Sequence, residues 1–311
     1  MQKSLDHAPA IILVSVGVES GTYCVFHVRY LVIKNIAYFP SYTALNSKPV
    51  YHTVLDTFQA AGIQTQENSM NSDAAVIWSV LWHGRMRGNR AVFDHYRKQN
   101  KPVVIIEIGA LYRGDTWKIS VNHITADGYY GHKENLNWDR PARLGISLAT
   151  LYEPRPEILL ALQHRNSQQV ADIPNMEHWV LETMAKIRAH TDRPIVVRPH
   201  PRSSIALPPG VTIEKPRPLP NTYDSFDMHF DCHAVVNYNS GPGIQAAIAG
   251  CRPIVDRTSL AFPVSVDFAD IESPYDMDRQ QWLVEICHTE HTLTEIKQGL
   301  WLKRIEPALT L

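Results

Sequence analysis

The sequence predicts an α/β protein with two Rossmann-like halves. Short runs rich in branched apolar residues alternate with amphipathic stretches of helical length, which is typical of βα units on a parallel sheet. The alternation fades between residues 122 and 156, where glycine, asparagine, proline and aromatic residues gather, and then restarts. A chain of 311 residues also has room for two domains. We therefore expect one domain over residues 1–152 and a second over residues 153–311.

Three strands and two helices are expected in the first half. The strands cover residues 35–39, 74–82 and 102–107, and the last (PVVIIE) is almost wholly apolar, as expected when helices cover both faces of a sheet. The helices cover residues 51–61, ending at Gly62, and 89–100. Residues 11–18 and 24–33 would form a hairpin or an added edge, and residues 152–156 an interdomain linker.

The second half repeats the pattern without any internal sequence repeat. We expect strands over residues 158–163, 194–198, 210–214, 234–238 and 252–255. Helices are expected over residues 176–190, 241–249, 279–288 and 292–302. The strand at 234–238 runs through a glycine-rich turn into the helix at 241–249.

Composition excludes several classes of protein. The formal net charge of −1 argues against a protein that simply coats nucleic acid or anionic lipid. The apolar run at residues 8–18 is too short for a membrane span and lacks the flanks of a signal peptide. The 4 cysteines, Cys24, Cys232, Cys251 and Cys287, are scattered, so we expect no disulfide framework and a cytoplasmic location.

The neutral total hides a difference between the two halves. Residues 1–150 carry 15 basic and 11 acidic side chains, whereas residues 151–311 carry 15 and 20. Most of the basic surplus lies in residues 81–143, with aromatic residues interleaved. This stretch is either a solvated surface over core aromatics or a groove for a polyanion or a sugar.

Gln163–Ser167 follows a predicted strand of the second half, and its small polar groups could face a cleft. Two other segments of this half also follow predicted strands and suit an anion. One pairs arginines and a histidine with prolines, and the other is a glycine-rich turn whose helix N-terminus attracts negative charge. The alternative for both is an ordinary turn, and neither has the GxGxxG or Walker pattern of a dinucleotide enzyme or a kinase. The candidate donor-binding residues are Arg198, His200, Pro201, Arg202, Ser240, Gly241, Gly243 and Gln245.

The first half offers carboxylates and an acceptor surface. A carboxylate at the tip of a buried strand suits a general base, and we expect Glu107 to be that base, with Asp115 second. The alternative for Glu107 is a structural ion pair with Arg85, Arg87 or Arg113. Candidate acceptor-binding residues are His83, Arg85, Arg87, Arg113, Trp117 and Lys118.

A metal site is not expected. The 15 histidines include no HExxH motif and no pair with ligand spacing beside a carboxylate. His288 and His291 lie at the end of a predicted helix, where we expect them on the surface. No GxSxG nucleophile elbow is present either.

In their order, these motifs resemble the bacterial capsular polysaccharide synthesis family. Its members are GT-B glycosyltransferases that transfer 3-deoxy-D-manno-octulosonic acid (Kdo) from a CMP-activated donor. The likeness spans residues 70–260 as short motifs. It rests on Trp82-His83-Gly84, on Glu107 through Gly114, on His200-Pro201 and on Ser240 through Ala246. Ile108 stands where the family has Asp, Gln245 where it has Glu, and Gly114 where it has Ser.

The resemblance implies a GT-B fold in which two domains face a central cleft. It implies a nucleotide-sugar co-substrate, no further cofactor and no essential metal. Arg198, His200 and the helix after Ser240 would neutralise the leaving phosphate. Glu107, or failing it Asp115, would deprotonate the acceptor hydroxyl.

Residues 113–122 also resemble bacteriophage-encoded relatives. Such enzymes glycosylate hydroxymethylated pyrimidines in DNA, and a base in duplex DNA would have to be flipped out. With the basic, aromatic stretch, this favours a 5-hydroxymethylpyrimidine in phage DNA as acceptor, with surface polysaccharide as the alternative. Further alternatives are a sugar-nucleotide epimerase and, because of Ile108, a catalytically silent nucleotide-binding protein.

Overall fold

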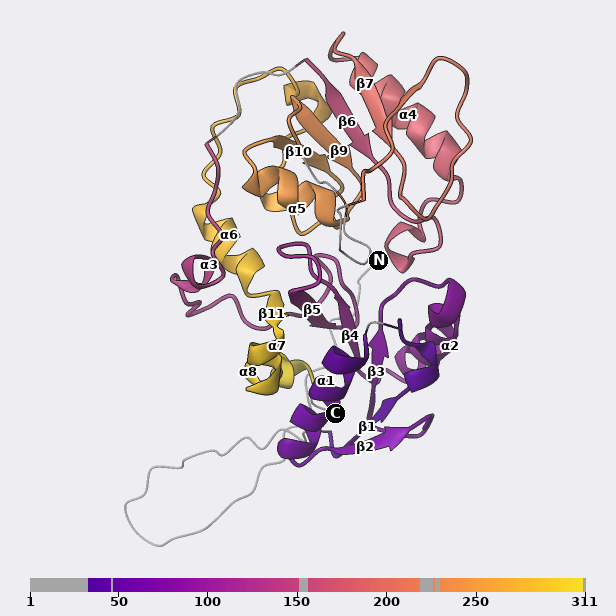
Figure 1. The fold of residues 1–311 in the computed structure, drawn as a ribbon, viewed down its shortest axis with the longest axis vertical. Coiled ribbons are helices and arrows are strands. Elements are labelled where there is room, and N and C mark those ends of the chain that lie inside the picture. Colours follow the sequence, from indigo (N-terminus) through magenta and orange to yellow (C-terminus); the bar gives the residue numbers. More distant parts are fainter. Residues whose placement is uncertain (1–32, 46, 151–155, 219–225, 227–229, 310–311) are drawn as a thin grey trace, which may run out of the picture.

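The computed structural model describes residues 33–45, 47–150, 156–218, 226 and 230–309. Two β-sheets organise these residues, one above the other in Figure 1. Helices pack on both sheets, so the mixed α/β class with parallel sheets is confirmed. The hairpin expected over residues 11–18 and 24–33 lies outside the described residues, apart from Ile33.

The first sheet has six strands in the order β11-β5-β4-β3-β1-β2. β5 is antiparallel to its neighbours β4 and β11, and the other pairs are parallel. β3 and β4 are central and almost fully buried, because their sequences are apolar on both faces. The strands are β1 (Asn35–Tyr38), β2 (Gln64–Glu67), β3 (Ala74–Trp78), β4 (Val103–Ile108), β5 (Thr116–Val121) and β11 (Glu290–Thr292).

Two helices cover opposite faces of the first sheet. α1 (Lys48–Ala60) buries Val54 and Phe58 against one face, and α2 (Asn89–Lys98) buries Phe93 and Tyr96 against the other. These clusters account for the apolar character of both faces of β3 and β4. The helices predicted at residues 51–61 and 89–100 are therefore confirmed, with shifted ends.

The second sheet has five parallel strands in the order β10-β9-β6-β7-β8. α4 (Met176–Arg188) packs Val180 and Ile187 on one face, and α5 (Gly241–Ile248) packs Ala246 on the other. The strands are β6 (Ile158–Ala161), β7 (Ile195–Arg198), β8 (Thr212–Ile213), β9 (Ala234–Asn237) and β10 (Arg252–Val255). All five were predicted, β10 with these bounds and the other four with longer ones.

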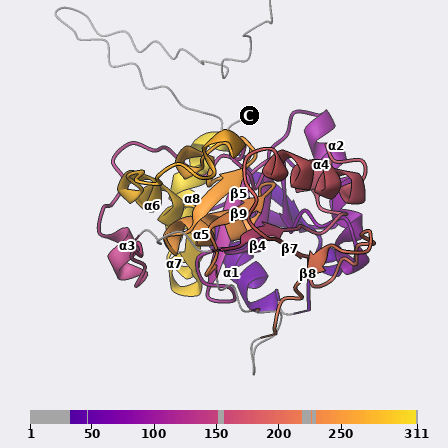
Figure 2. The same cartoon turned by 90° about the horizontal axis from the view of Figure 1, so that it is seen from above.

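The carboxyl ends of the two sheets face each other. The loop after β3 pairs with the loop after β6 through a bridge between Leu81 and Ser167. The Trp82 amide donates to the Asn166 carbonyl at 2.9 Å nearby. Figure 2 looks down on the second sheet, with the first sheet behind it. This edge-to-edge contact brings together loops from distant parts of the sequence.

The last residues of the chain return to the first sheet. α6 (Gln280–Cys287) leads into β11, and α7 (Leu293–Lys297) and α8 (Leu300–Ile305) follow beside α1 (Figure 1). The single helix predicted at residues 292–302 is wrong, because Thr292 caps α7 and Gly299, at φ +72°, separates it from α8. The domain division at residue 152 stays a prediction, and β11 joins the first sheet from beyond it.

Short helices complete the described residues. They are α3 (Arg140–Arg143) and the 3₁₀ helices at Pro40–Tyr42, Gly84–Gly88, Gln168–Val170, Phe262–Val264, Phe268–Asp270 and Glu306–Ala308. Within the ranges that the structure describes, every helix is too short or too polar to cross a membrane.

His288 and His291 are buried, contrary to the surface position expected for them. Their exposed fractions are 7% and 2%, because His291 lies within β11 and His288 is hydrogen-bonded to Val284 and Asn137. Cys232 and Cys251 also lie closer than their spacing suggests, with Sγ atoms 3.4 Å apart as buried free thiols.

Candidate functional site

Polar side chains gather where the carboxyl ends of β6, β7 and β9 lie side by side. β6 is the switch point of the second sheet, since β7 lies on one side of it and β9 on the other. Ligands of open α/β sheets bind at such points. Gln163, after β6, and Asn239, after β9, are joined by two hydrogen bonds of 2.9 and 2.7 Å. This buried pair fixes the two loops relative to each other.

Three imidazole rings form a row from the first half into the second, which we call the histidine row. His83 follows β3, His164 follows β6 and His200 follows β7, with ring centroids 5.3 and 5.2 Å apart. Each ring accepts a hydrogen bond at Nδ1, His83 and His164 from Asn166 and His200 from the Arg202 amide. In its neutral form each ring therefore carries its proton on Nε2.

His200 is neutral at pH 7. Burial lowers the pKa of His200 to about 4, and His164, Arg113 and Arg202 act in the same direction. Burial likewise lowers the pKa of His164. His200 can therefore donate a hydrogen bond from Nε2 without carrying a charge. A neutral donor among arginines suits a phosphate oxygen.

The turn from β9 into α5 presents a helix N-terminus to the same edge. Asn237 and Ser240 exchange two hydrogen bonds of 2.9 Å, and the Ser240 hydroxyl caps none of the helix amides. A Cβ on Gly241 would lie 3.2 Å from Ala110 of the first half, and one on Gly243 would press on a β10 side chain. The glycines therefore permit close packing where the positive end of the helix dipole meets the loop that carries Ala110.

Glu107 lies half-buried at the end of β4 with a fixed carboxylate. Its Oε2 accepts from the Ser79 hydroxyl at 2.7 Å, and its Oε1 accepts from the Ile108 amide at 3.0 Å. Ser79 has φ +65°, an uncommon conformation for a residue with a Cβ, and its Oγ also accepts from the Leu81 amide. The turn after β3 therefore orients the carboxylate predicted to be the base.

Lys118 is buried, although it was predicted to contact the acceptor. It is 7% exposed, with Glu107 opposite it on β4 and Glu290 opposite it on β11. Burial lowers the pKa of Lys118, while the charges of Glu290 and Glu107 favour its protonated form. Its neighbour Trp117 is half-buried against the core. The geometry of Lys118 favours a structural role.

The basic, aromatic stretch does not form one surface. Arg140 is 9% exposed and pairs with Glu295 at 2.5 Å, and Tyr96 is fully buried. By contrast, Tyr112 and Trp138 are 41% and 60% exposed. The stretch is therefore divided between core and surface, which favours the solvated-surface interpretation.

The other predicted acceptor and base residues lie on exposed loops after β3 and β4. Asp115 is exposed in the turn before β5. Arg85 and Arg87 are exposed in the short helix after His83, and no ion pair joins them to Glu107 within the described part of the chain. Arg113 is exposed and close enough to His200 to affect its pKa.

The remaining donor-site residues flank the histidine row and α5. Pro201 and Arg202 are exposed after His200, and Gln245 is partly buried on α5. Among the residues that the structure describes, no three His, Cys, Asp or Glu side chains are arranged to hold a metal ion.

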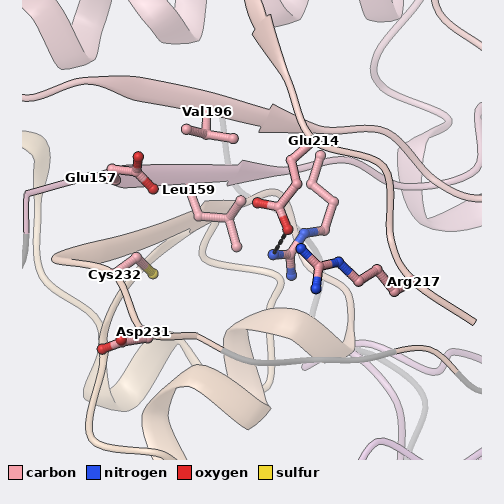
Figure 3. A pocket seen from close by; sticks show the side chains of 8 residues that line it. Glu157, Leu159, Val196, Glu214, Arg217, Asp231 and Cys232 are labelled. Atoms are coloured by element: carbon pink, nitrogen blue, oxygen red, sulfur yellow. Dashed lines mark hydrogen bonds and ion pairs between the residues drawn. The ribbon is translucent and has the colours of Figure 1, made fainter. Parts of the chain in front are cut away.

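Arg198 occupies a different place from His200. Its Nη2 pairs with Glu214 at 3.1 Å, and its Nε and Nη1 are buried with no hydrogen-bond partner among the described residues. Figure 3 shows the cavity of about 280 Å³ beside it, where Arg217 and Glu214 approach from one side. Most of the other lining residues precede or begin β6 and β9, away from the carboxyl edge: Glu157, Leu159, Asp231 and Cys232. Arg198 is thus engaged outside the histidine row.

Comparison with known proteins bears on the fold. No protein-family model and no curated protein matches this chain. A solved structure of Thermosulfurimonas dismutans KpsC, described as a beta Kdo 2,4 transferase, matches with a TM-score of 0.50 and 12% identity, covering 86% of this chain and 98% of that one. This chain shares that fold. A second T. dismutans KpsC structure, a beta Kdo 2,7 transferase, gives a TM-score of 0.46 at 13% identity, covering 86% and 99%.

Ser79 was not predicted at the site, and its place after β3 at the carboxyl edge was the available signal. Gln163, His164 and Asn239 lie in segments that the sequence placed after strands at this edge, but no role was predicted for these three residues. Glu290 had no such signal, because it lies on an edge strand whose one neighbour in the sheet, β5, is far upstream in the sequence.

Proposed function

We propose that this protein is a GT-B glycosyltransferase that moves a sugar from a nucleotide-sugar donor to an acceptor hydroxyl. The observation that carries the proposal is that the facing carboxyl edges of the two sheets carry different chemical groups. An oriented carboxylate, Glu107, lies on the first edge, and His200 and the N-terminus of α5 lie on the second. Sugar transfer needs a base on one side and a phosphate site on the other. The fold shared with a Kdo transferase agrees with this proposal.

The second half would hold the donor. His200 would donate from Nε2 to a phosphate oxygen, and the N-terminus of α5 would add its partial positive charge. Negative charge grows on the phosphate as the sugar leaves, so these donors stabilise the transition state more than the ground state. Their presence is the reason to propose that no metal and no cofactor beyond the nucleotide sugar is needed.

The first half would activate the acceptor. The acceptor oxygen forms a bond to the anomeric carbon while the bond from that carbon to the phosphate oxygen breaks. The electron pair of the broken bond leaves with the nucleotide, and Glu107 takes the hydroxyl proton. Ser79 would keep the Glu107 carboxylate aimed at the acceptor, since it donates to Oε2.

For the acceptor we propose a growing surface polysaccharide, with the protein acting in the cytoplasm. The resemblance to the capsular polysaccharide family and the KpsC fold favour it. The hydroxymethylpyrimidine in DNA rested on the basic stretch, and burial of Lys118 and Arg140 removes part of that charge from the surface. Transfer to DNA is therefore kept as an alternative result of the assay described next.

The test is a transfer assay with purified protein. A thermal-shift screen against CMP- and UDP-sugars first finds the donor, because a bound ligand raises the apparent stability. The donor is then incubated with capsular oligosaccharide or with hydroxymethylated duplex DNA, and nucleotide release and sugar incorporation are measured. We expect transfer to the oligosaccharide only.

Matched variants assign the roles. Glu107→Gln should lower the transfer rate by about 10²- to 10⁴-fold, and His200→Ala by about 10²-fold. If Asp115→Asn abolishes transfer while Glu107→Gln does not, the base is Asp115. If both Glu107→Gln and His200→Ala leave transfer intact, the assignment is wrong.

The rival functions give different outcomes. A sugar-nucleotide epimerase would convert the donor without an acceptor, and a silent binding protein would bind a nucleotide without consuming it. Incorporation of sugar into hydroxymethylated DNA would replace the polysaccharide with DNA as acceptor.

A further inference from the structure

The carboxylate of Glu290 is enclosed within the first sheet. Glu290 is 0% exposed and belongs to β11, the edge strand supplied by the end of the chain. Its Oε1 accepts from the Ala110 amide at 2.6 Å. Its Oε2 accepts from the Leu111 amide at 3.0 Å and from the Thr116 hydroxyl at 2.7 Å. Three donors from one loop and its following strand thus converge on one side chain.

Those donors belong to the β4–β5 loop, residues 109–115, and to the first residue of β5. Gly109 begins this loop, and a Cβ there would collide with the Glu290 carboxylate and with Thr116. The Thr116 hydroxyl stands within hydrogen-bonding distance of Tyr112 at both its amide and its carbonyl. The path of the loop is therefore shaped around Glu290.

The charge of Glu290 is balanced inside the sheet. Lys118 lies directly opposite Glu290 on β5, and Glu107 lies directly opposite Lys118 on β4. Directly opposed residues of antiparallel strands point to the same face. A row of carboxylate, ammonium and carboxylate thus joins Glu290 to the proposed base across three strands.

The β4–β5 loop lies beside both the proposed base and the N-terminus of α5. It starts beside Glu107, and Ala110 within it lies against Gly241 at the N-terminus of α5. Arg113 within it is near enough to His200 to influence its charge. A shift of this loop would change the distance between the base and the phosphate site.

We propose that Glu290 is a positioning residue for sugar transfer. By binding the Ala110 and Leu111 amides and the Thr116 hydroxyl, it fixes the β4–β5 loop, which sets Glu107 relative to the N-terminus of α5. This inference rests on the proposed glycosyltransferase function. It adds a residue from the end of the chain that touches neither donor nor acceptor.

The experiment measures transfer kinetics and loop protection in full-length variants. Glu290→Gln replaces one acceptor oxygen with an amide that cannot accept. A displacement of about 1 Å costs on the order of 10²-fold in rate. We expect kcat to fall about 10- to 100-fold, with the donor KM and the Kd for the free nucleotide changing less than about twofold. Amide exchange at residues 110 and 111, followed by mass spectrometry, should become faster.

Thr116 supplies a second variant with its own rescue. Thr116→Val removes the hydroxyl at similar volume and should lower kcat, whereas Thr116→Ser keeps the hydroxyl and should restore it. Glu285→Gln is the matched control, because Glu285 lies on α6 and pairs with Lys133 outside the site. It should leave kcat unchanged.

The outcomes separate the two proposals. Unchanged kcat in Glu290→Gln and Thr116→Val, or a fall in nucleotide affinity parallel to kcat, overturns the positioning role. Wild-type protein that transfers no sugar with any donor refutes the proposed function instead. In that case, amide exchange at residues 110 and 111 in Glu290→Gln still tests whether Glu290 fixes the β4–β5 loop. Faster exchange supports this role, and unchanged exchange overturns it.

Discussion

Acid should destabilise this protein through His288, because both ring nitrogens of the neutral side chain make hydrogen bonds. His288 Nδ1 donates to the Val284 carbonyl at 2.7 Å, and Nε2 accepts from the Asn137 amide at 3.3 Å. Protonation at Nε2 would break the second bond and place a cation in a buried site near Arg140 and Arg304. Burial above all, together with these arginines, lowers the pKa of His288 to about 4.

The sign and size of the effect follow from that pKa. In the unfolded chain a histidine titrates near 6.5, so below this pH the unfolded state binds a proton that the native state does not. Stability contributed by neutral His288 is therefore present above pH 6.5 and is lost as the pH falls toward 4. At about 1.4 kcal/mol per pH unit, the loss is about 3 kcal/mol.

Urea unfolding at several pH values between 7 and 4, followed by tryptophan fluorescence, measures this loss. His288→Gln keeps a donor and an acceptor but does not titrate, so it should be less stable than wild type at pH 7 and lose about 3 kcal/mol less on acidification. His52→Gln, on the exposed side of α1, should follow wild type. Parallel stability curves for wild type and His288→Gln would refute the reasoning.

Three further predictions concern buried groups. Arg140→Ala should destabilise the protein by about 3–5 kcal/mol in urea unfolding, because it leaves Glu295 partly buried without its partner. Gly243→Ala should cost about 1–3 kcal/mol in the same assay, since its Cβ would lie 2.8 Å from Val255 Cγ1. Burial raises the pKa of Cys287 to about 12, so peptide mapping should find it unlabelled by thiol reagents at pH 8 unless urea is added.

Strands that are apolar on both faces were predictable from the sequence. β4 (VVIIEI) and β6 (ILLA) are central in their sheets, and a central strand between helices needs no polar positions. The turn into α5 was predictable for a different reason, because Ser240 suits the N-cap of a helix and Pro242 suits its first turn. The candidate residues Glu107, His200 and Ser240 all lie at the ends of such strands.

β2, β5 and β11 were not predicted, and the signals of β5 and β11 depend on partners far along the chain. β5 carries Lys118 at a buried position, and a lysine in a strand indicates an exposed face unless its carboxylates are known. One of those carboxylates, Glu290, lies in a three-residue strand that was assigned to the connection between two helices. Neither strand can be identified alone, because the buried Lys118 of β5 and the buried Glu290 of β11 each need the opposite charge of the other.

The same dependence bears on how the site works. The chain leaves the first sheet, builds the second, and then returns to place β11 at the edge of the first. Glu290 on that returning strand holds the β4–β5 loop, which in turn meets α5 of the second sheet through Ala110 and Gly241. The loop is therefore constrained from both sides, by a strand inserted last in sequence and by a helix of the opposing sheet. Moving α5 away from the first sheet would separate Ala110 from Gly241, whereas shifting the loop within the first sheet would break its hydrogen bonds to Glu290.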